Sequence, residues 1–179
     1  MEQNFWFPPP RSIKRQIVRH NFFGCSGMHT VKPGPILLVD DDPVDYQMMG
    51  DVLESLSYND ELVWFDNVAG ALHFLQTTLL QPFLIISDIR MPRANGLELR
   101  EAINNNEFLR RKSIPFIFMS TTAHPNEVCK AYDLTVQGFF EKSHTFPEMQ
   151  SQMKLIIDYW SRCKHPNSVN HGRMKAFRT

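Results

Sequence analysis

The sequence predicts an α/β fold, a doubly wound five-stranded parallel sheet with helices on both faces. Five short apolar runs, each the length of a buried strand, alternate with segments whose apolar residues recur at helical spacing. Continuous rather than alternating apolar runs are typical of strands covered on both faces of a parallel sheet. The five expected strands are residues 36–39, 62–65, 83–86, 116–119 and 138–140.

Five helices are expected between and after these strands. The first follows residue 42, where apolar residues recur every four positions and would form one buried stripe. That stripe is Val44, Met48, Val52 and Leu56. Three further helices are expected near residues 68–75, 97–103 and 125–134. Thr145 and Glu148 have capping-box spacing, which predicts the start of a last helix ending near residue 160.

The charge distribution divides the chain into three parts. The 179 residues include 19 Lys plus Arg and 19 Asp plus Glu, so the formal net charge is zero. Residues 1–33 and 161–179 are nevertheless basic, whereas residues 34–160 are acidic. We therefore expect a basic, disordered N-terminal extension over 1–33, one folded domain over 34–160 and a basic, disordered C-terminal tail over 161–179. Met28 is an alternative start, in which case residues 1–27 would not belong to the native protein.

Several classes of protein are disfavoured by composition. No apolar run approaches the length needed to span a bilayer. The three cysteines, Cys25, Cys129 and Cys163, are scattered and odd in number, which argues against a disulfide framework. A reducing, cytoplasmic location is the expectation from this pattern.

Polar side chains follow four of the five expected strands. They are Asp40, Asp41 and Asp42 after the first, Asp88 after the third, Ser120 at the end of the fourth and Lys142 after the fifth. Carboxyl ends of parallel strands share one edge of a sheet, and ligands bind there. Clustered carboxylates suit Mg²⁺, while a lysine and a hydroxyl suit a phosphoryl group. A carboxylate can itself accept the phosphoryl group. Asp42 before Pro43 is also typical of a helix N-cap.

These residues resemble the receiver domain of two-component response regulators, over about residues 35–160. The segment Ile-Leu-Leu-Val-Asp-Asp-Asp-Pro at 36–43 resembles the first strand and acidic pair of the family. Residues 88–96 fit its D-x-x-M-P-x-x-x-G loop. Ile-Pro-Phe-Ile-Phe-Met-Ser at 114–120 and Gly-Phe-Phe-Glu-Lys at 138–142 resemble its fourth and fifth strands. The resemblance implies a single-domain receiver with a flavodoxin-like fold.

The resemblance also implies a role for each residue. Asp88 would accept the phosphoryl group, with Lys142 and Ser120 contacting its oxygens. Mg²⁺ would be held directly by Asp41, Asp88 and the backbone carbonyl of Arg90, and by Asp40 through water. Ser120 and Phe139 would form the switch. Phe139 also suits a static place in the core, since aromatic residues are common there.

The implied partners are proteins. The phosphoryl group would come from a histidine kinase or a histidine phosphotransfer protein and would alter binding to a downstream protein target. The domain would be a phosphoacceptor rather than a turnover enzyme. Neither end of the chain shows a DNA-binding domain, and a homodimer is one further arrangement typical of receivers.

Two residues depart from the usual pattern. Ser143 follows Lys142 where the family usually has a proline joined by a cis peptide bond, so the Lys142–Ser143 bond could be cis or trans with a rearranged loop. Arg90 could lie over the site or be solvated or paired with an acid.

Three alternatives remain. Asp40 and Asp42, followed by Val44, match the signature of haloacid-dehalogenase-like phosphatases, with Asp40 as nucleophile and Asp42 as general acid/base, but the acidic pair expected after Lys142 is missing. The second alternative is a receiver-fold binding module that works without phosphorylation. The third is nucleic-acid binding through the basic tails.

Overall fold

A computed structural model describes residues 34–58 and 60–163. Its strands are β1 (Ile36–Val39), β2 (Leu62–Phe65), β3 (Leu84–Ser87), β4 (Phe116–Ser120) and β5 (Gly138–Glu141). Its helices are α1 (Pro43–Ser55), α2 (Val68–Thr77), α3 (Gly96–Asn105), α4 (Glu107–Arg111), α5 (Pro125–Asp133) and α6 (Phe146–Arg162). The expected tails lie outside the described residues, apart from 161–163 at the end of α6.

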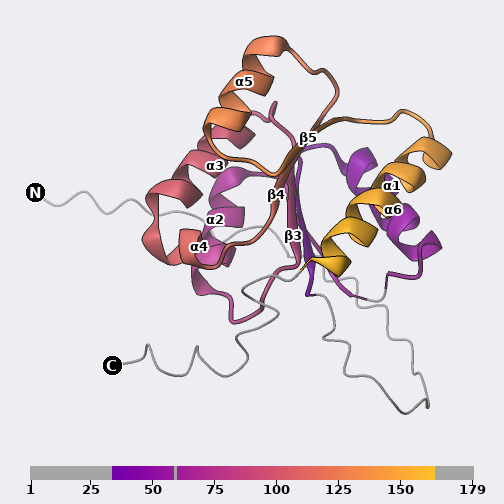
Figure 1. Cartoon of the computed structure of the whole chain (residues 1–179), viewed down its shortest axis with the longest axis horizontal. Helices are drawn as coiled ribbons and strands as arrows, with labels where there is room; N and C mark the ends of the chain where they lie inside the picture. The colour runs from indigo at the N-terminus through magenta and orange to yellow at the C-terminus, as the bar shows by residue number, and fades with distance from the viewer. Residues whose placement is uncertain (1–33, 59, 164–179) are drawn as a thin grey trace, which may run out of the picture.

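The five strands form one parallel sheet in the order β2-β1-β3-β4-β5. Helices α1 and α6 cover one face, and α2, α3, α4 and α5 cover the other (Figure 1). The chain moves from β1 to β2 in one direction and then returns past β1 to β3, so β1 and β3 flank the point where the winding reverses. The predicted doubly wound fold is confirmed.

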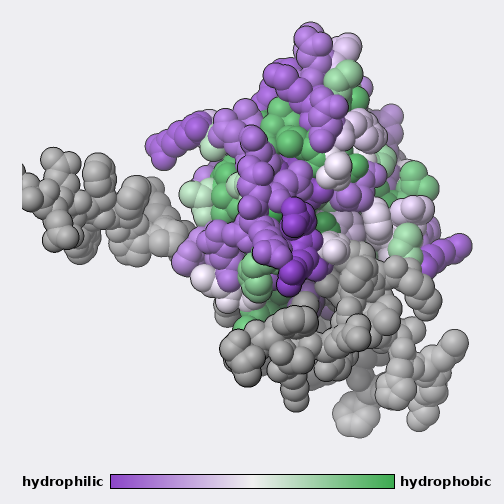
Figure 2. Space-filling model, turned by 60° about the vertical axis from the view of Figure 1, so that its left-hand side comes forward, coloured by the Kyte–Doolittle hydropathy of each residue, from purple (hydrophilic) through white to green (hydrophobic). Residues whose placement is uncertain are grey.

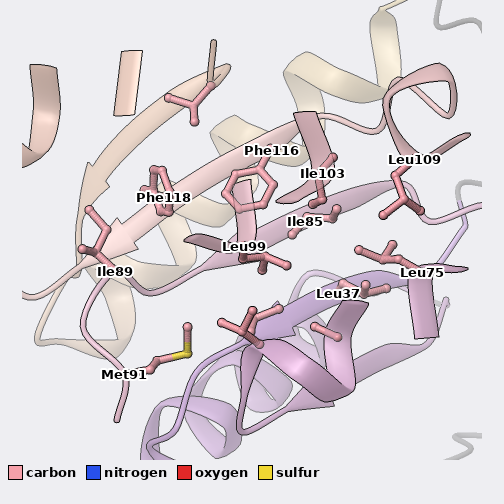
Figure 3. Packing of buried hydrophobic residues seen from close by; sticks show 14 of the residues in the cluster. Leu37, Leu75, Ile85, Ile89, Met91, Leu99, Ile103, Leu109, Phe116 and Phe118 are labelled. Atoms are coloured by element: carbon pink, nitrogen blue, oxygen red, sulfur yellow. The ribbon is translucent and has the colours of Figure 1, made fainter. Parts of the chain in front are cut away.

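Two apolar layers hold the helices on the sheet. Leu37, Ile85 and Phe116 face the layer beneath α2, α3 and α4, where Leu99 and Ile103 pack against them (Figure 3). On the opposite face, Met49 of α1 and Met153 of α6 pack on the alternate strand residues. Because both faces are buried, β1 is apolar throughout, and β3 and β4 are apolar up to the serine that ends each strand.

The buried face of helix α1 differs from the predicted apolar stripe. Val44 is 65% exposed, and the buried residues of the helix are Met49, Val52 and Leu53. The helix is therefore rotated by about one residue from the orientation that regular four-residue spacing indicated. This rotation places Asp45, one turn before Met49, on the side that faces the sheet.

Two further expectations at helix ends were wrong. Thr145 is the N-cap residue of α6, but its side chain makes no capping hydrogen bond, so the predicted capping box is not formed. A sixth helix, α4, was not predicted, because it has only five residues and follows α3 directly; Asn106 caps it by accepting a hydrogen bond from the backbone N–H of Leu109.

The surface formed on the side of α2, α3 and α4 is mainly hydrophilic, with hydrophobic residues in small separate areas (Figure 2). Within the described part of the chain, no helix has both the length and the hydrophobicity to cross a bilayer.

Candidate functional site

The carboxyl ends of four neighbouring strands bring the predicted site residues together. Asp40 follows β1, Asp88 follows β3, Ser120 is the last residue of β4 and Lys142 follows β5. The strand register places Asp40 and Asp88 level with each other along the sheet, since the residues before them, Val39 and Ser87, are paired across β1 and β3. All four residues are buried although they are polar, so the three charged ones need polar partners within the site.

Lys142 is the centre of the cluster. Its ammonium nitrogen lies 2.7 Å from Oδ2 of Asp40, 2.7 Å from Oδ2 of Asp45 and 3.0 Å from Oδ2 of Asp88. Burial alone would lower the pKa of Lys142, but attraction to Asp40, Asp45 and Asp88 outweighs it and raises the pKa above its ordinary value. The lysine is therefore a fixed cation in contact with the predicted phosphoacceptor.

Asp88 is held on both oxygens. Oδ1 accepts hydrogen bonds from the backbone N–H groups of Ile89 at 2.5 Å and Arg90 at 3.2 Å, and Oδ2 faces Lys142. Gly96 lets the start of α3 approach this loop, because a Cβ there would lie 2.1 Å from the backbone oxygen of Asp88. The carboxylate is thus oriented by the backbone of its own loop.

Asp40 is buried more deeply than an isolated carboxylate tolerates. Its Oδ1 accepts a hydrogen bond from the backbone N–H of Asp42 at 3.0 Å, and its Oδ2 accepts one from Lys142. Burial raises the pKa of Asp40 to about 6, and the opposing attraction to Lys142 recovers only part of the penalty. The contact with Lys142 therefore does not fully offset the cost of burying this carboxylate.

Three carboxylates are close enough to share one cation. Oxygen atoms of Asp40, Asp41 and Asp88 lie within 4.8 Å of one another, and Asp41 is the more exposed of the three. A hard divalent cation prefers such oxygen ligands, and it would also offset the cost of burying the Asp40 carboxylate. The residues present therefore fit Mg²⁺. Asp42 stands apart, because its carboxylate accepts a hydrogen bond from the backbone N–H of Val44 at 2.8 Å and caps α1.

The two predicted switch residues line β4 and β5. Ser120 is fully buried, and its Oγ has no hydrogen-bond partner among the described residues. Phe139 is partly buried and packs against Phe118, with ring centroids 6.2 Å apart. A buried hydroxyl without a hydrogen-bond partner carries a desolvation cost, and a partner gained in another state of the site would remove that cost.

The side chain of Arg90 is paired with an acid. Its guanidinium donates to both carboxylate oxygens of Glu127, at 3.3 and 3.2 Å, and thereby joins the loop after β3 to the first turn of α5. The Lys142–Ser143 bond is trans, since residues 34–58 and 60–163 contain no cis peptide bond. Of the two possibilities for this loop, the trans arrangement is therefore the correct one.

Asp45 is the site residue that the sequence interpretation missed. The predicted apolar stripe of α1 implied that Asp45 faces solvent, whereas Asp45 contacts Lys142. A better signal was available, because Asp45, Met49 and Val52 have i, i+4, i+7 spacing on one helix face. Trp64 was also missed: its indole N–H donates to the backbone oxygen of Asp40 at 2.7 Å.

Comparison with known proteins agrees with this geometry. Residues 36–154 match the response regulator receiver domain family. Response regulator Rcp1 of Synechocystis sp. is 28% identical over 133 residues, which cover 72% of this chain and 89% of Rcp1.

Two solved structures have the same fold. The crystal structure of the phosphorylated cyanobacterial phytochrome response regulator RcpA has a TM-score of 0.67 and 24% identity, and the match covers 74% of this chain and 97% of that one. The Mn²⁺-bound form of Rcp1 has a TM-score of 0.64 and 27% identity, with 74% and 98% covered. The family match excludes the haloacid-dehalogenase-like interpretation built on Asp40 and Asp42. With its flavodoxin-like sheet and its acidic strand ends, the chain belongs to the response regulator receiver domain family of two-component signalling.

Proposed function

We propose that this protein is a receiver of a two-component phosphorelay that accepts a phosphoryl group on Asp88. The observation that supports this proposal best is the contact between Lys142 and Asp88 at 3.0 Å, in a site where Asp88 is already oriented by two backbone N–H groups. A histidine kinase or histidine phosphotransfer protein supplies the group, and a downstream protein target responds. In this role the domain is a phosphoacceptor and not a turnover enzyme.

In the proposed reaction, an oxygen of Asp88 attacks the phosphorus atom of a phosphohistidine. The new P–O bond forms as the P–N bond breaks, and the imidazole nitrogen leaves with the bonding electron pair. Lys142 neutralises charge on the phosphoryl oxygens, and the unpaired Oγ of Ser120 donates a hydrogen bond to one of them. Phe139 then repacks beside β4 and β5.

Asp40, Asp41, Asp88 and the backbone carbonyl of Arg90 are the proposed ligands of Mg²⁺. When bound, the cation would neutralise charge on the acidic cluster and on the incoming phosphoryl oxygens. The Mn²⁺ in the Rcp1 structure supports this assignment by similarity. The chain's own contribution is to hold the carboxylates in place, through the Asp42 N–H on Asp40 and the loop N–H groups on Asp88.

The test is mass spectrometry of the intact protein and its peptides after incubation with acetyl phosphate and Mg²⁺. Wild type should gain one phosphoryl group on Asp88, and Asp88→Asn should gain none. Asp42→Asn is the matched control, because Asp42 is an exposed cap outside the cluster, and it should label normally. Wild-type protein that stays unlabelled would instead favour a binding module that works without phosphorylation.

We also propose the domain division inferred from charge, with basic segments over 1–33 and 161–179 flanking the receiver. Nucleic-acid binding by these segments would show as strongly salt-dependent affinity that is lost when they are deleted.

A further inference from the structure

Lys142 has a third acceptor that lies outside the proposed metal cluster. Asp45, in the first turn of α1, places Oδ2 2.7 Å from the ammonium nitrogen, which is closer than the 3.0 Å to Asp88. The Asp45 carboxylate is not among the three whose oxygen atoms gather within 4.8 Å of one another. Its contact with Lys142 therefore needs an explanation of its own.

The ammonium group is saturated by these contacts. Lysine has three N–H donors, and Asp40, Asp45 and Asp88 supply three acceptors. The small space beside the ammonium is lined by Asp40, Asp45 and Lys142 and is closed by apolar side chains. These apolar side chains are Leu38, Met49, Ile86, Met119 and Met149. A new acceptor at Lys142 must therefore replace an existing one.

Asp45 is the acceptor that can be released at the lowest cost. The Asp40 side chain is 2% exposed, so losing Lys142 would leave a buried charge unpaired. Releasing Asp88 would move Lys142 away from the residue that receives the phosphoryl group. The Asp45 side chain is 27% exposed, and water can hydrate it when the lysine turns away.

We propose that Asp45 is a positioning residue that competes with the phosphoryl group for Lys142 and thereby opposes phosphorylation of Asp88. This inference rests on the proposed function. The Asp45–Lys142 contact stabilises the unphosphorylated site and is given up as Lys142 turns toward the phosphoryl oxygens. An interaction that is stronger before a reaction than in its transition state slows that reaction. Removing Asp45 should accordingly speed phosphorylation.

The experiment measures the rate at which acetyl phosphate, with saturating Mg²⁺, labels full-length protein. Asp45→Asn keeps the size of the side chain and removes its charge. Asp51→Asn is the matched control, because Asp51 is an exposed acid of the same helix whose carboxylate accepts from Gln47 rather than Lys142. Both substitutions are also made in a Lys142→Ala background, so that a double-mutant cycle isolates the contact.

We expect Asp45→Asn to label about three- to tenfold faster than wild type, the range that follows from removing the charge of one partly exposed acceptor of Lys142. Asp51→Asn should label at the wild-type rate. In the Lys142→Ala background, Asp45→Asn should change the rate by less than about twofold, the usual limit for independent sites. Equal acceleration in both backgrounds would mean that Asp45 acts only by repelling an anionic donor and would overturn the proposal.

Slower labelling of Asp45→Asn would also overturn it, because the carboxylate would then hold Lys142 in its productive place. If Lys142→Ala proteins label too slowly for a rate to be measured, the affinity for beryllium trifluoride, a phosphoryl mimic, is measured instead of the labelling rate. Binding is followed by the fluorescence of Trp64, which lies beside Asp40. Failure of the proposed function can be distinguished from failure of the Asp45 proposal, since wild type itself would then remain unlabelled on Asp88.

Discussion

Replacing Asp40 with asparagine should stabilise the metal-free protein near neutral pH. The Asp40 side chain is 2% exposed, and its pKa is raised from 3.8 to about 6. A shift of roughly two pKa units corresponds to about 3 kcal/mol of unfavourable free energy for the charged form. Asparagine removes the charge while Lys142 keeps Asp45 and Asp88 as partners, so no buried charge is left unpaired. We expect Asp40→Asn to raise the free energy of unfolding by about 1–3 kcal/mol.

The pH dependence of this difference follows from the direction of the shift. Between pH 3.8 and about 6, the folded state keeps a proton on Asp40 that the unfolded state releases. The stability of wild type should therefore fall as pH rises through this window, and the penalty should be complete above it. The groups that face Asp40 are Lys142, Asp45, Asp88 and Asp42. Because wild type and Asp40→Asn both retain these groups, the difference between their free energies of unfolding isolates the effect of Asp40.

The assay is urea unfolding followed by circular dichroism in EDTA, at several values of pH from 5 to 8. The advantage of Asp40→Asn should grow with pH, and saturating Mg²⁺ should reverse the order by stabilising wild type more than the variant. Asp42→Asn is the control outside the cluster. A variant that is less stable than wild type in EDTA at neutral pH would refute the argument, because Lys142 would then compensate Asp40 fully.

Three further changes test other parts of the site. Gly96→Ala should lower the free energy of unfolding by about 2–3 kcal/mol and slow labelling, because its Cβ would lie 2.1 Å from the backbone oxygen of Asp88; urea unfolding and the labelling rate measure both effects. Trp64→Phe should abolish most of the tryptophan fluorescence change on Mg²⁺ addition, because the indole N–H donates to the backbone oxygen of Asp40. Arg90→Gln should change the free energy of unfolding by less than about 1 kcal/mol, because the side chain it replaces is 46% exposed and its ion pair to α5 is screened; thermal unfolding gives the value.

The sheet was predictable because its strands are buried on both faces. Ile36 to Val39 and Phe116 to Met119 are apolar without interruption, and the next residue of each run is polar because it emerges at the edge. Strand position alone therefore brought Asp40, Asp88, Ser120 and Lys142 to one edge. The end of each strand was uncertain by about one residue, as β3 shows by including Ser87.

Helix orientation was harder to predict, and Asp45 was missed for this reason. Val44, Met48, Val52 and Leu56 repeat every four residues, which drifts around a helix of 3.6 residues per turn. The packed face follows Met49, Val52 and Leu53 instead. Hydrophobicity does not distinguish the two faces, because Val44 at 65% exposure is as apolar as the residues that are buried.

The same rotation of α1 connects the stability of the fold to the chemistry of the site. Met49 packs in the apolar layer, and it also lies beside Lys142 in the space that Asp40 and Asp45 close. The packing that orients α1 therefore sets the distance from Asp45 to the lysine. In the proposed reaction Lys142 is shared between α1 and the phosphoacceptor, so a change in α1 packing alters the rate of phosphorylation without touching Asp88. Met49→Ala tests this coupling: it should loosen the Asp45–Lys142 contact and raise the labelling rate, even though it destabilises the fold by about 2–5 kcal/mol. Labelling that merely falls with stability would show that the packing of α1 does not govern the lysine.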